Sequence, residues 1–288
     1  SASSRCIGEH SPIHRRDLIF LWVDIVSARE DDHLRLSLHG DLKDLLHRRY
    51  RQDTLLHYPL SRRASIKDIL DAVGIPHTEI GAIYKGALQL AFNYLPLPGD
   101  QLEIYGVTAG PAAAEPSVLR PRAPGDFRFL VDINIARLAG LLRMTGFDTV
   151  SVRDLPHSYS KRDIARESRT SGRILLSRDK ELLKHREVAF GRLVRTQDPT
   201  AQLIEIVDFY GLRSRLAPFS RCLKCNGLLV PVVKETVVHR LEPLTKRYYH
   251  SFRQCGSCSS IYWRGSHHER MLQLLEPVLT DDNYRQDD

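Results

Sequence analysis

Short apolar segments alternate with helical patterns through the middle of the chain. FLVD is an apolar strand that ends at Asp132, and a helical pattern and a second strand after Gly146 follow it. Another apolar strand, GRILLSRD, ends at Asp179 and runs into a helix. Strands that alternate with helices at this spacing are typical of a parallel sheet with crossover helices. The pattern therefore predicts an α/β domain over residues 127–215.

The same alternation continues beyond Asp179. EVAFGRLVRT predicts a further strand, and DPTAQLIEIVDFYGL predicts a helix that ends at Gly211. Either Asp198 or Thr200 can cap the start of this helix, because both side chains accept hydrogen bonds from free backbone N–H groups. The α/β domain therefore includes this helix.

Residues 31–108 show a different pattern. HLRLSLHG alternates apolar and polar positions from His33, as a half-buried strand does. Ser65 is a suitable N-cap for SIKDILDAVG, whose apolar residues fall at helical spacing and which ends at Gly74. A hairpin in GAIYKGALQLAF and a last strand after a Pro-Gly-Asp turn complete a small α+β roll of the ubiquitin or sulfur-carrier type.

The segments that flank this roll lack such patterns. Residues 1–30 have no clear periodicity and are predicted to be a poorly ordered leader, while residues 109–126 are rich in Ala and Pro, which predicts an extended linker. A sulfur carrier needs a free Gly-Gly terminus, whereas this chain continues into the linker. The roll is therefore expected to dock a protein partner or a substrate rather than to carry sulfur.

Charge is unevenly distributed along the chain. The formal net charge is +7; residues 1–110 carry 13 basic and 14 acidic side chains, and residues 111–288 carry 29 and 21. A basic excess over the α/β part suits a polyanionic partner. A basic surface that only keeps the protein soluble would have the same composition.

Four of the five cysteines form two C-x-x-C pairs, and Cys6 is left over. Two such pairs supply the four thiolates of a tetrahedral, structural Zn²⁺ site. Metal-binding thiols, rather than a disulfide framework, are typical of a reducing compartment, so a cytoplasmic protein is expected. The chain has no apolar run of about 18 residues, so no membrane span is expected. The predicted ligands are Cys222, Cys225, Cys255 and Cys258.

Two aspartates follow apolar strands of the predicted sheet. The carboxyl ends of parallel strands gather along one edge, where ligands bind, and Asp132 and Asp179 both lie at such ends. Two neighbouring carboxylates repel each other unless a cation lies between them. A hard cation such as Mg²⁺ or Mn²⁺ is therefore expected at this edge.

Several motifs, in order, resemble one known family. FLVD followed by RLAGLLRMTGFDT, then GRILLSRDKELL, RCLKCNG and YWRGSH are similar to the RNase domain found at the carboxyl terminus of mut-seven exonuclease homologues, over roughly residues 127–275. That family resembles PIN-type nucleases with an appended zinc ribbon, here residues 216–276, and a ubiquitin-like domain often precedes it. The resemblance implies a PIN-like α/β fold and a metal-dependent ribonuclease that hydrolyses RNA phosphodiester bonds.

The resemblance also implies catalytic carboxylates. Asp132, Asp179 and Asp198 match family aspartates that would hold Mg²⁺ or Mn²⁺, although a helix cap is the favoured interpretation of Asp198. The family usually has an acidic pair just before the next helix, where this chain has Ser160 and Lys161.

Two nearby acids could replace the missing pair. Asp163 lies two residues later, and Asp154 lies in the preceding loop. If neither reaches the metal, the site has lost a ligand, and RNA binding could be the function that remains.

Basic side chains surround this region. Arg178 lies next to Asp179, which favours a phosphate contact, and Arg162 and Arg166 share one helix face by i, i+4 spacing. Such a face could follow an RNA backbone or could simply be solvated. Arg143, in the LLRMTG helix, is a fourth candidate for substrate binding.

Three functions are consistent with these features: a metal-dependent ribonuclease, an RNA-binding protein without catalysis, or a module that acts through protein contacts. Geometry separates them. Three carboxylates within about 5 Å of one point would favour the enzyme, because one or two metal ions can span that distance. Only two acids in reach would favour binding.

Overall fold

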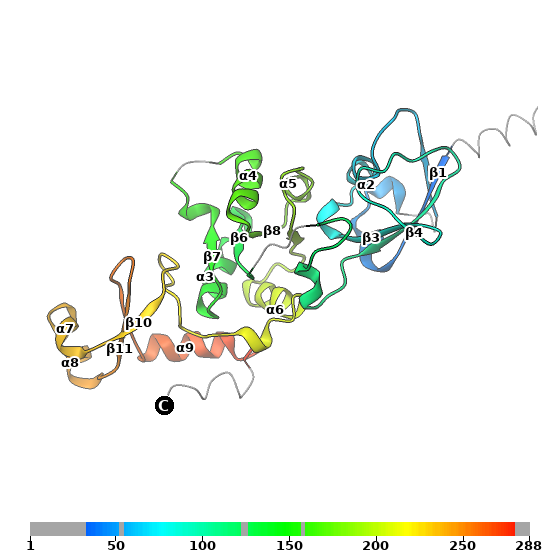
Figure 1. The fold of residues 1–288 in the computed structure, drawn as a ribbon. Helices are drawn as coiled ribbons and strands as arrows, with labels where there is room; N and C mark the ends of the chain where they lie inside the picture. The colour runs from blue at the N-terminus through cyan, green and yellow to red at the C-terminus, as the bar shows by residue number, and fades with distance from the viewer. Residues whose placement is uncertain (1–32, 52–54, 122–125, 157–158, 280–288) are drawn as a thin grey trace, which may run out of the picture.

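The computed structural model describes residues 33–51, 55–121, 126–156 and 159–279, so the predicted leader over residues 1–30 lies outside the described part. Three structural units follow one another along the chain (Figure 1). An N-terminal mixed sheet is followed by a parallel sheet with helices and then by a small antiparallel sheet. This order confirms the predicted fold class, a ubiquitin-like roll, a PIN-like α/β domain and a C-terminal ribbon.

The N-terminal unit is a five-stranded roll with the strand order β2-β1-β5-β3-β4. The two strands β1 and β5 are parallel, and the other pairs are antiparallel. The helix α2 (Ile66–Val73) begins after Ser65, whose hydroxyl accepts from the Asp68 N–H, and ends at Gly74 in the left-handed conformation, as predicted. The strands are β1 (His33–Leu38), β2 (Leu56–Pro59), β3 (Ile80–Lys85), β4 (Leu88–Gln89) and β5 (Gln101–Gly106).

The α/β domain is built on a four-stranded parallel sheet with the order β7-β6-β8-β9. Each strand has only three or four residues. The strands are β6 (Phe129–Val131), β7 (Thr149–Ser151), β8 (Ile174–Ser177) and β9 (Gly191–Leu193), and the helices are α3 (Ala136–Met144), α4 (Lys161–Ser171), α5 (Lys180–Leu183) and α6 (Pro199–Phe209).

Alternate residues of the two central strands point into two hydrophobic cores. Leu130 and Leu175 belong to one core with residues of α4, α5 and the roll, whereas Phe129 and Leu176 belong to the other with residues of α3 and α6. All residues of β6 and β8 are buried. Burial on both faces explains why these strands are continuous apolar runs in the sequence.

The ribbon is a three-stranded antiparallel sheet with the order β10-β11-β12. The C-terminal helix leads back to the α/β domain, because Leu275 and Val278 are buried in the core that contains α3 and α6. No helix in the described ranges is both long enough and apolar enough to cross a membrane. The elements are β10 (Leu229–Val232), α7 (Lys234–Val237), α8 (Pro243–Tyr248), β11 (Phe252–Cys255), β12 (Ile261–Trp263) and α9 (Ser266–Leu275).

The segment predicted as an extended linker is folded against both neighbouring domains where it is described. It contains a short 3-10 helix (Pro111–Ala114), and the Gly110 N–H donates to the Phe209 carbonyl oxygen at 2.6 Å. Arg120 is buried, and its guanidinium donates to the carbonyl oxygens of Thr78 and Ile80 at 3.1 and 2.5 Å. Burial lowers the pKa of Arg120. The segment therefore fastens the roll to the α/β domain.

Glu79 is a buried acid in the contact between these two domains. Its side chain is 1% exposed and accepts from Arg192 Nη1 at 2.7 Å and from the Leu193 N–H at 2.8 Å. Burial raises the pKa of Glu79, and the positive charge of Arg192 opposes this effect. Successive N–H groups of a strand point to opposite sides. The Val194 N–H donates to Ser177 of β8, so the Leu193 N–H points away from β8, to the free side of β9. Glu79 therefore caps that edge.

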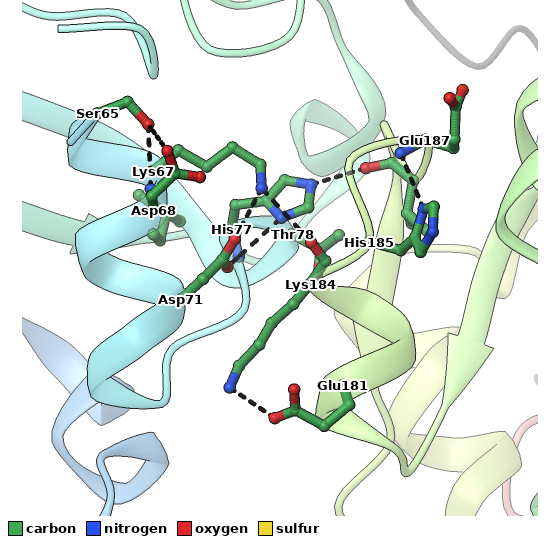
Figure 2. Close-up of polar contacts among 12 residues, drawn as sticks. Ser65, Lys67, Asp68, Asp71, His77, Thr78, Glu181, Lys184, His185 and Glu187 are labelled. Carbon is green, nitrogen blue, oxygen red and sulfur yellow. Dashed lines mark hydrogen bonds and ion pairs between the residues drawn. The ribbon is translucent and has the colours of Figure 1, made fainter. Parts of the chain in front are cut away.

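A second group of polar contacts lies between α2 and the segment after α5 (Figure 2). Lys67 binds Asp71 at 2.7 Å and also reaches the Lys184 carbonyl oxygen at 3.4 Å. His77 Nε2 donates to the Val188 carbonyl oxygen at 2.8 Å. Polar contacts thus surround an apolar core that both domains share.

Replacing Glu79 tests how much its contacts with Arg192 and Leu193 stabilise the packing of the roll against the α/β domain. Glu79→Ala should lower the free energy of unfolding by about 3–5 kcal/mol, because it leaves the Arg192 guanidinium buried without its acceptor. Glu79→Gln should cost less, because its amide oxygen still accepts from the Leu193 N–H. Urea unfolding measures both values. Equal free energies of unfolding for wild type and Glu79→Ala would show that Glu79 does not stabilise the contact between the two domains.

Candidate active site and metal centre

The four predicted zinc ligands lie together in the ribbon. All four Sγ atoms are within 4.8 Å of one another, and the four cysteines are free. Sulfur ligands at about 2.3 Å from a tetrahedral zinc ion lie about 3.8 Å apart. The Sγ atoms of Cys222 and Cys258 are 3.6 Å apart, and those of Cys225 and Cys255 are 3.4 Å apart. This set fits a closed, structural zinc site.

Polar side chains contact two of the thiols. The Cys258 Sγ lies 3.2 Å from the Ser260 hydroxyl, and hydrogen bonding with Ser260 lowers the pKa of Cys258 to about 6. The Tyr262 hydroxyl lies 3.1 Å from the Cys222 Sγ. Tyr262 therefore supports the metal loop.

The first metal loop is fastened to the free edge of β7. Asn226 Oδ1 accepts from the Thr149 N–H at 3.0 Å, and Asn226 Nδ2 donates to Asp148 Oδ1 at 2.7 Å. Arg221 donates to the Gly146 carbonyl oxygen at 3.0 Å. Gly146 has a φ of 99°, and a Cβ atom there would lie 2.4 Å from the Ala217 carbonyl oxygen, so the close approach requires glycine.

Arg143 belongs to this contact. It is 5% exposed and donates to the Thr149 and Leu223 carbonyl oxygens at 2.8 and 3.0 Å, and it forms an ion pair with Asp154. Its guanidinium is thus used to join α3, β7 and the metal loop. The structure therefore gives Arg143 a structural position, not the solvent-facing one expected of a phosphate contact.

Removing the metal should unfold the ribbon and leave the other two domains folded. A region with so small a core depends on metal binding for folding. Cys222→Ser, or treatment with a chelator, should expose β10–β12 to rapid hydrogen–deuterium exchange, while β6 and β8 stay protected. Ser257→Ala, beside the ligands but not one of them, is the control. Unchanged exchange after zinc loss would contradict a structural role.

The contact between ribbon and α/β domain should weaken in acid. Burial acts to raise the pKa of Asp148, but hydrogen bonds from Arg173 and Asn226 outweigh it, and the net pKa is lowered. A lowered folded-state pKa contributes stability above the unfolded value of about 3.9, and this contribution is lost as pH falls through the folded value.

Asp148→Asn should therefore reduce stability at neutral pH and make the difference from wild type shrink below about pH 4. Urea unfolding at a series of pH values measures this difference, and the protonation of zinc ligands affects both proteins alike. Asp208→Asn, which removes a surface partner of Arg213, is the control. A difference that does not depend on pH would show that Asp148 acts through packing alone.

Two carboxylates mark the carboxyl edge of the parallel sheet. Asp132 directly follows β6 and is 4% exposed; its Oδ1 accepts from the Ile133 N–H at 2.7 Å, and its Oδ2 accepts from the Ser177 hydroxyl at 2.6 Å. The Ser177 oxygen in turn accepts from the Asp179 N–H at 2.9 Å. Because β6 and β8 are adjacent, Ser177 links the two aspartates.

Asp179 is the N-cap of α5 and also binds a cation. Its Oδ1 accepts from the Glu181 N–H at 2.9 Å, and its Oδ2 lies 2.6 Å from Lys161 Nζ. Burial acts to raise the pKa of Asp179, but the hydrogen bond from Lys161 and those from the Glu181 and Leu182 N–H groups together outweigh it, and the net pKa is lowered. Asp179 is thus ionised at neutral pH.

The other candidate acids have separate partners. Asp163 forms a capping box with Ser160 at the start of α4, and Asp198 caps α6 by accepting from Thr200 and Ala201 N–H groups at 2.9 Å each. Asp154 pairs with Arg143. Within the described ranges, only the four cysteines form a compact group of three or more metal-ligand side chains. The structure thus links Asp132 to the backbone of Asp179 through Ser177 and gives the other predicted acids capping or pairing contacts.

The pair suits a single hard cation. Mg²⁺ usually keeps several waters and is bound by one or two carboxylates together with substrate phosphates. Each Asp132 oxygen accepts one hydrogen bond, so each retains a lone pair. The donors present therefore fit one Mg²⁺ or Mn²⁺ ion better than a two-metal site.

The remaining predicted phosphate contacts lie around this edge. Arg178 donates to the Thr196 carbonyl oxygen at 2.7 Å and is partly exposed, and Arg162 and Arg166 are exposed on α4. Sequence reasoning missed Ser177. Ser177 is a polar residue at the end of the apolar strand ILLS, and the same pattern made Asp132 a candidate. This pattern could have identified Ser177 as a site residue.

The fold and the site define a class: an α/β protein with paired carboxylates at the carboxyl edge of a parallel sheet, a four-cysteine centre and a ubiquitin-like roll. Comparison with known families is more specific. The family model described as the Mut7-C RNAse domain matches residues 127–275, and that described as Mut7-C ubiquitin matches residues 32–110. The chain therefore belongs to the Mut7-C RNAse domain family, which indicates a nuclease-type function. Neither a curated protein nor a solved structure matches.

Proposed function

We propose that this protein is a ribonuclease that cleaves RNA phosphodiester bonds at the carboxyl edge of its parallel sheet. The observation that carries the proposal is the link from Asp132 through Ser177 to Asp179. A carboxylate that is only 4% exposed is costly for a fold, because burial removes the charged group from water. Its placement at the ligand-binding edge of the sheet is explained by a metal-dependent reaction.

The side chains have distinct tasks in this reaction. Asp132 and Asp179 would hold Mg²⁺ or Mn²⁺, which supplies an activated water and neutralises the charge that grows on the scissile phosphate. Ser177 fixes the orientation of Asp132 by donating to its Oδ2. Arg178 lies beside Asp179 and is the arginine best placed to contact the phosphate. Ser177 is therefore a positioning residue for the site.

RNA is the proposed substrate because the surface next to the site is basic. Arg162 and Arg166 are exposed on α4, the helix whose first residue contacts Asp179. Binding to such a face should weaken steeply with salt, since each neutralised phosphate releases counterions. The ubiquitin-like roll uses one side to contact the α/β domain, and we infer that its remaining surface binds a protein partner. We also infer a reducing, cytoplasmic location from the free cysteines.

A second function, RNA binding without catalysis, is favoured by the number of acids, the criterion derived from the sequence. No third acid joins Asp132 and Asp179 within the described ranges, and Lys161 occupies the position of an expected family acid. A PIN-like fold with a depleted acidic site could still bind RNA through its basic residues.

Cleavage of end-labelled RNA distinguishes the two functions. Purified wild type should cut single-stranded or structured RNA with Mn²⁺ or Mg²⁺ and not with EDTA. Asp132→Asn and Asp179→Asn should each reduce the rate by at least about 100-fold, since each removes a charged metal ligand. Ser177→Ala should reduce it less, because Asp132 keeps its charge.

Asp198→Asn is the matched control, because an asparagine oxygen can still cap α6. The Asp198→Asn variant should still cleave RNA if Asp198 only caps the helix. Loss of cleavage would indicate that Asp198 is a metal ligand. No cleavage by wild type, together with salt-sensitive RNA binding that all variants retain, would replace the nuclease proposal with the binding function.

A further inference from the structure

Lys161 places a positive charge on a proposed metal ligand. It is the first residue of α4, and its Nζ lies 2.6 Å from Asp179 Oδ2. The Lys161 side chain is 55% exposed, whereas that of Asp179 is 29% exposed. The Asp179 Oδ1 is already used to cap α5. Oδ2 is thus the oxygen best placed to bind a metal ion, and the Lys161 ammonium is bound to it.

An ammonium group and a divalent cation compete for such an oxygen. Both are attracted to the same negative charge, and they repel each other at close range. A divalent cation that binds to both Asp132 and Asp179 must therefore displace Lys161.

Lys161 can leave Asp179 at little cost. Ion pairs this exposed contribute little net stability, because solvent competes for both charges. The start of α4 is fixed independently by the capping box between Ser160 and Asp163. Rotation of the Lys161 side chain therefore suffices to move the ammonium, and the helix itself need not move. A compact ammonium on a flexible stem is also a good ligand for a phosphate.

We propose, on the basis of the ribonuclease function above, that Lys161 couples RNA binding to metal binding. Without RNA, Lys161 neutralises Asp179 and weakens the binding of Mg²⁺ or Mn²⁺. When RNA binds, the ammonium moves to a backbone phosphate next to the scissile bond and frees Asp179 for the metal ion. The two ligands then increase each other's affinity by the same factor, as linkage requires.

Binding of Mn²⁺ to zinc-loaded, full-length protein tests this coupling without measuring catalysis. Electron paramagnetic resonance would report free Mn²⁺ with and without a single-stranded 2′-O-methyl phosphorothioate RNA, which resists cleavage. Wild type should bind Mn²⁺ weakly alone and roughly 5- to 150-fold more tightly with the RNA, the usual range of coupling between sites. Lys161→Ala should bind Mn²⁺ more tightly than wild type without RNA and should gain little when RNA is added.

Two variants control for charge and for folding. Arg169→Ala removes the same charge from α4 eight residues further on, about 12 Å along the helix, and should leave Mn²⁺ affinity without RNA within about twofold of wild type, since its partner is Glu187 and its field at Asp179 is screened at that distance. Lys161→Arg keeps the charge and should behave like wild type. Gain of affinity in Lys161→Ala is not a result that misfolding can produce.

The outcomes separate this inference from the proposed function. Equal Mn²⁺ affinity of wild type and Lys161→Ala, or equal gains in Lys161→Ala and Arg169→Ala, would overturn the coupling but leave the metal site in place. Absence of Mn²⁺ binding in every variant, with and without RNA, would overturn both.

Discussion

The structure depends on covering the two open edges of a very small parallel sheet. Strands of three or four residues expose unpaired N–H and C=O groups at β7 and β9, and a parallel sheet is stable only when it is well covered. A side chain from an appended domain caps an outer N–H on each side: Asn226 binds Thr149 on β7, and Glu79 binds Leu193 on β9. The zinc ribbon and the ubiquitin-like roll are therefore structural parts of the α/β domain, in addition to any role with partners.

This arrangement leaves the carboxyl ends of the strands as the part of the sheet available for chemistry. The appended domains occupy the lateral edges, and α3 and α6 line one core while α4 and α5 line the other. Asp132 and Asp179 follow the two central strands, β6 and β8. The positions of both residues therefore depend on the ribbon at β7 and on the roll at β9. Zinc binding and roll docking are thus expected to affect the site through the geometry of the sheet, although neither domain supplies a carboxylate.

Sequence patterns could predict the parts of this structure that depend on local periodicity. The α2 helix with its Ser65 cap, the central strands and the four cysteines were all predicted, because burial period, capping chemistry and C-x-x-C spacing are local properties. The contacts made by Glu79, Arg120 and Asn226 could not be predicted, because their partners lie far away in the sequence. The same limit applies to Arg143, whose place in the basic LLRMTG helix suggested a phosphate contact.

The start of α4 shows how the charge of such a site can change while the fold is retained. Ser160 and Asp163 form the capping box at the start of the helix. Lys161 lies between these two residues in the sequence, and its side chain is not needed for capping. That first position nevertheless points toward Asp179. An acidic residue at position 161 would add a ligand to the proposed metal site, whereas Lys161 adds a positive charge to it. The backbone of α4 can be the same with either residue. If the proposed metal site is correct, its metal affinity and the stability of the helix are therefore controlled by different residues within one turn.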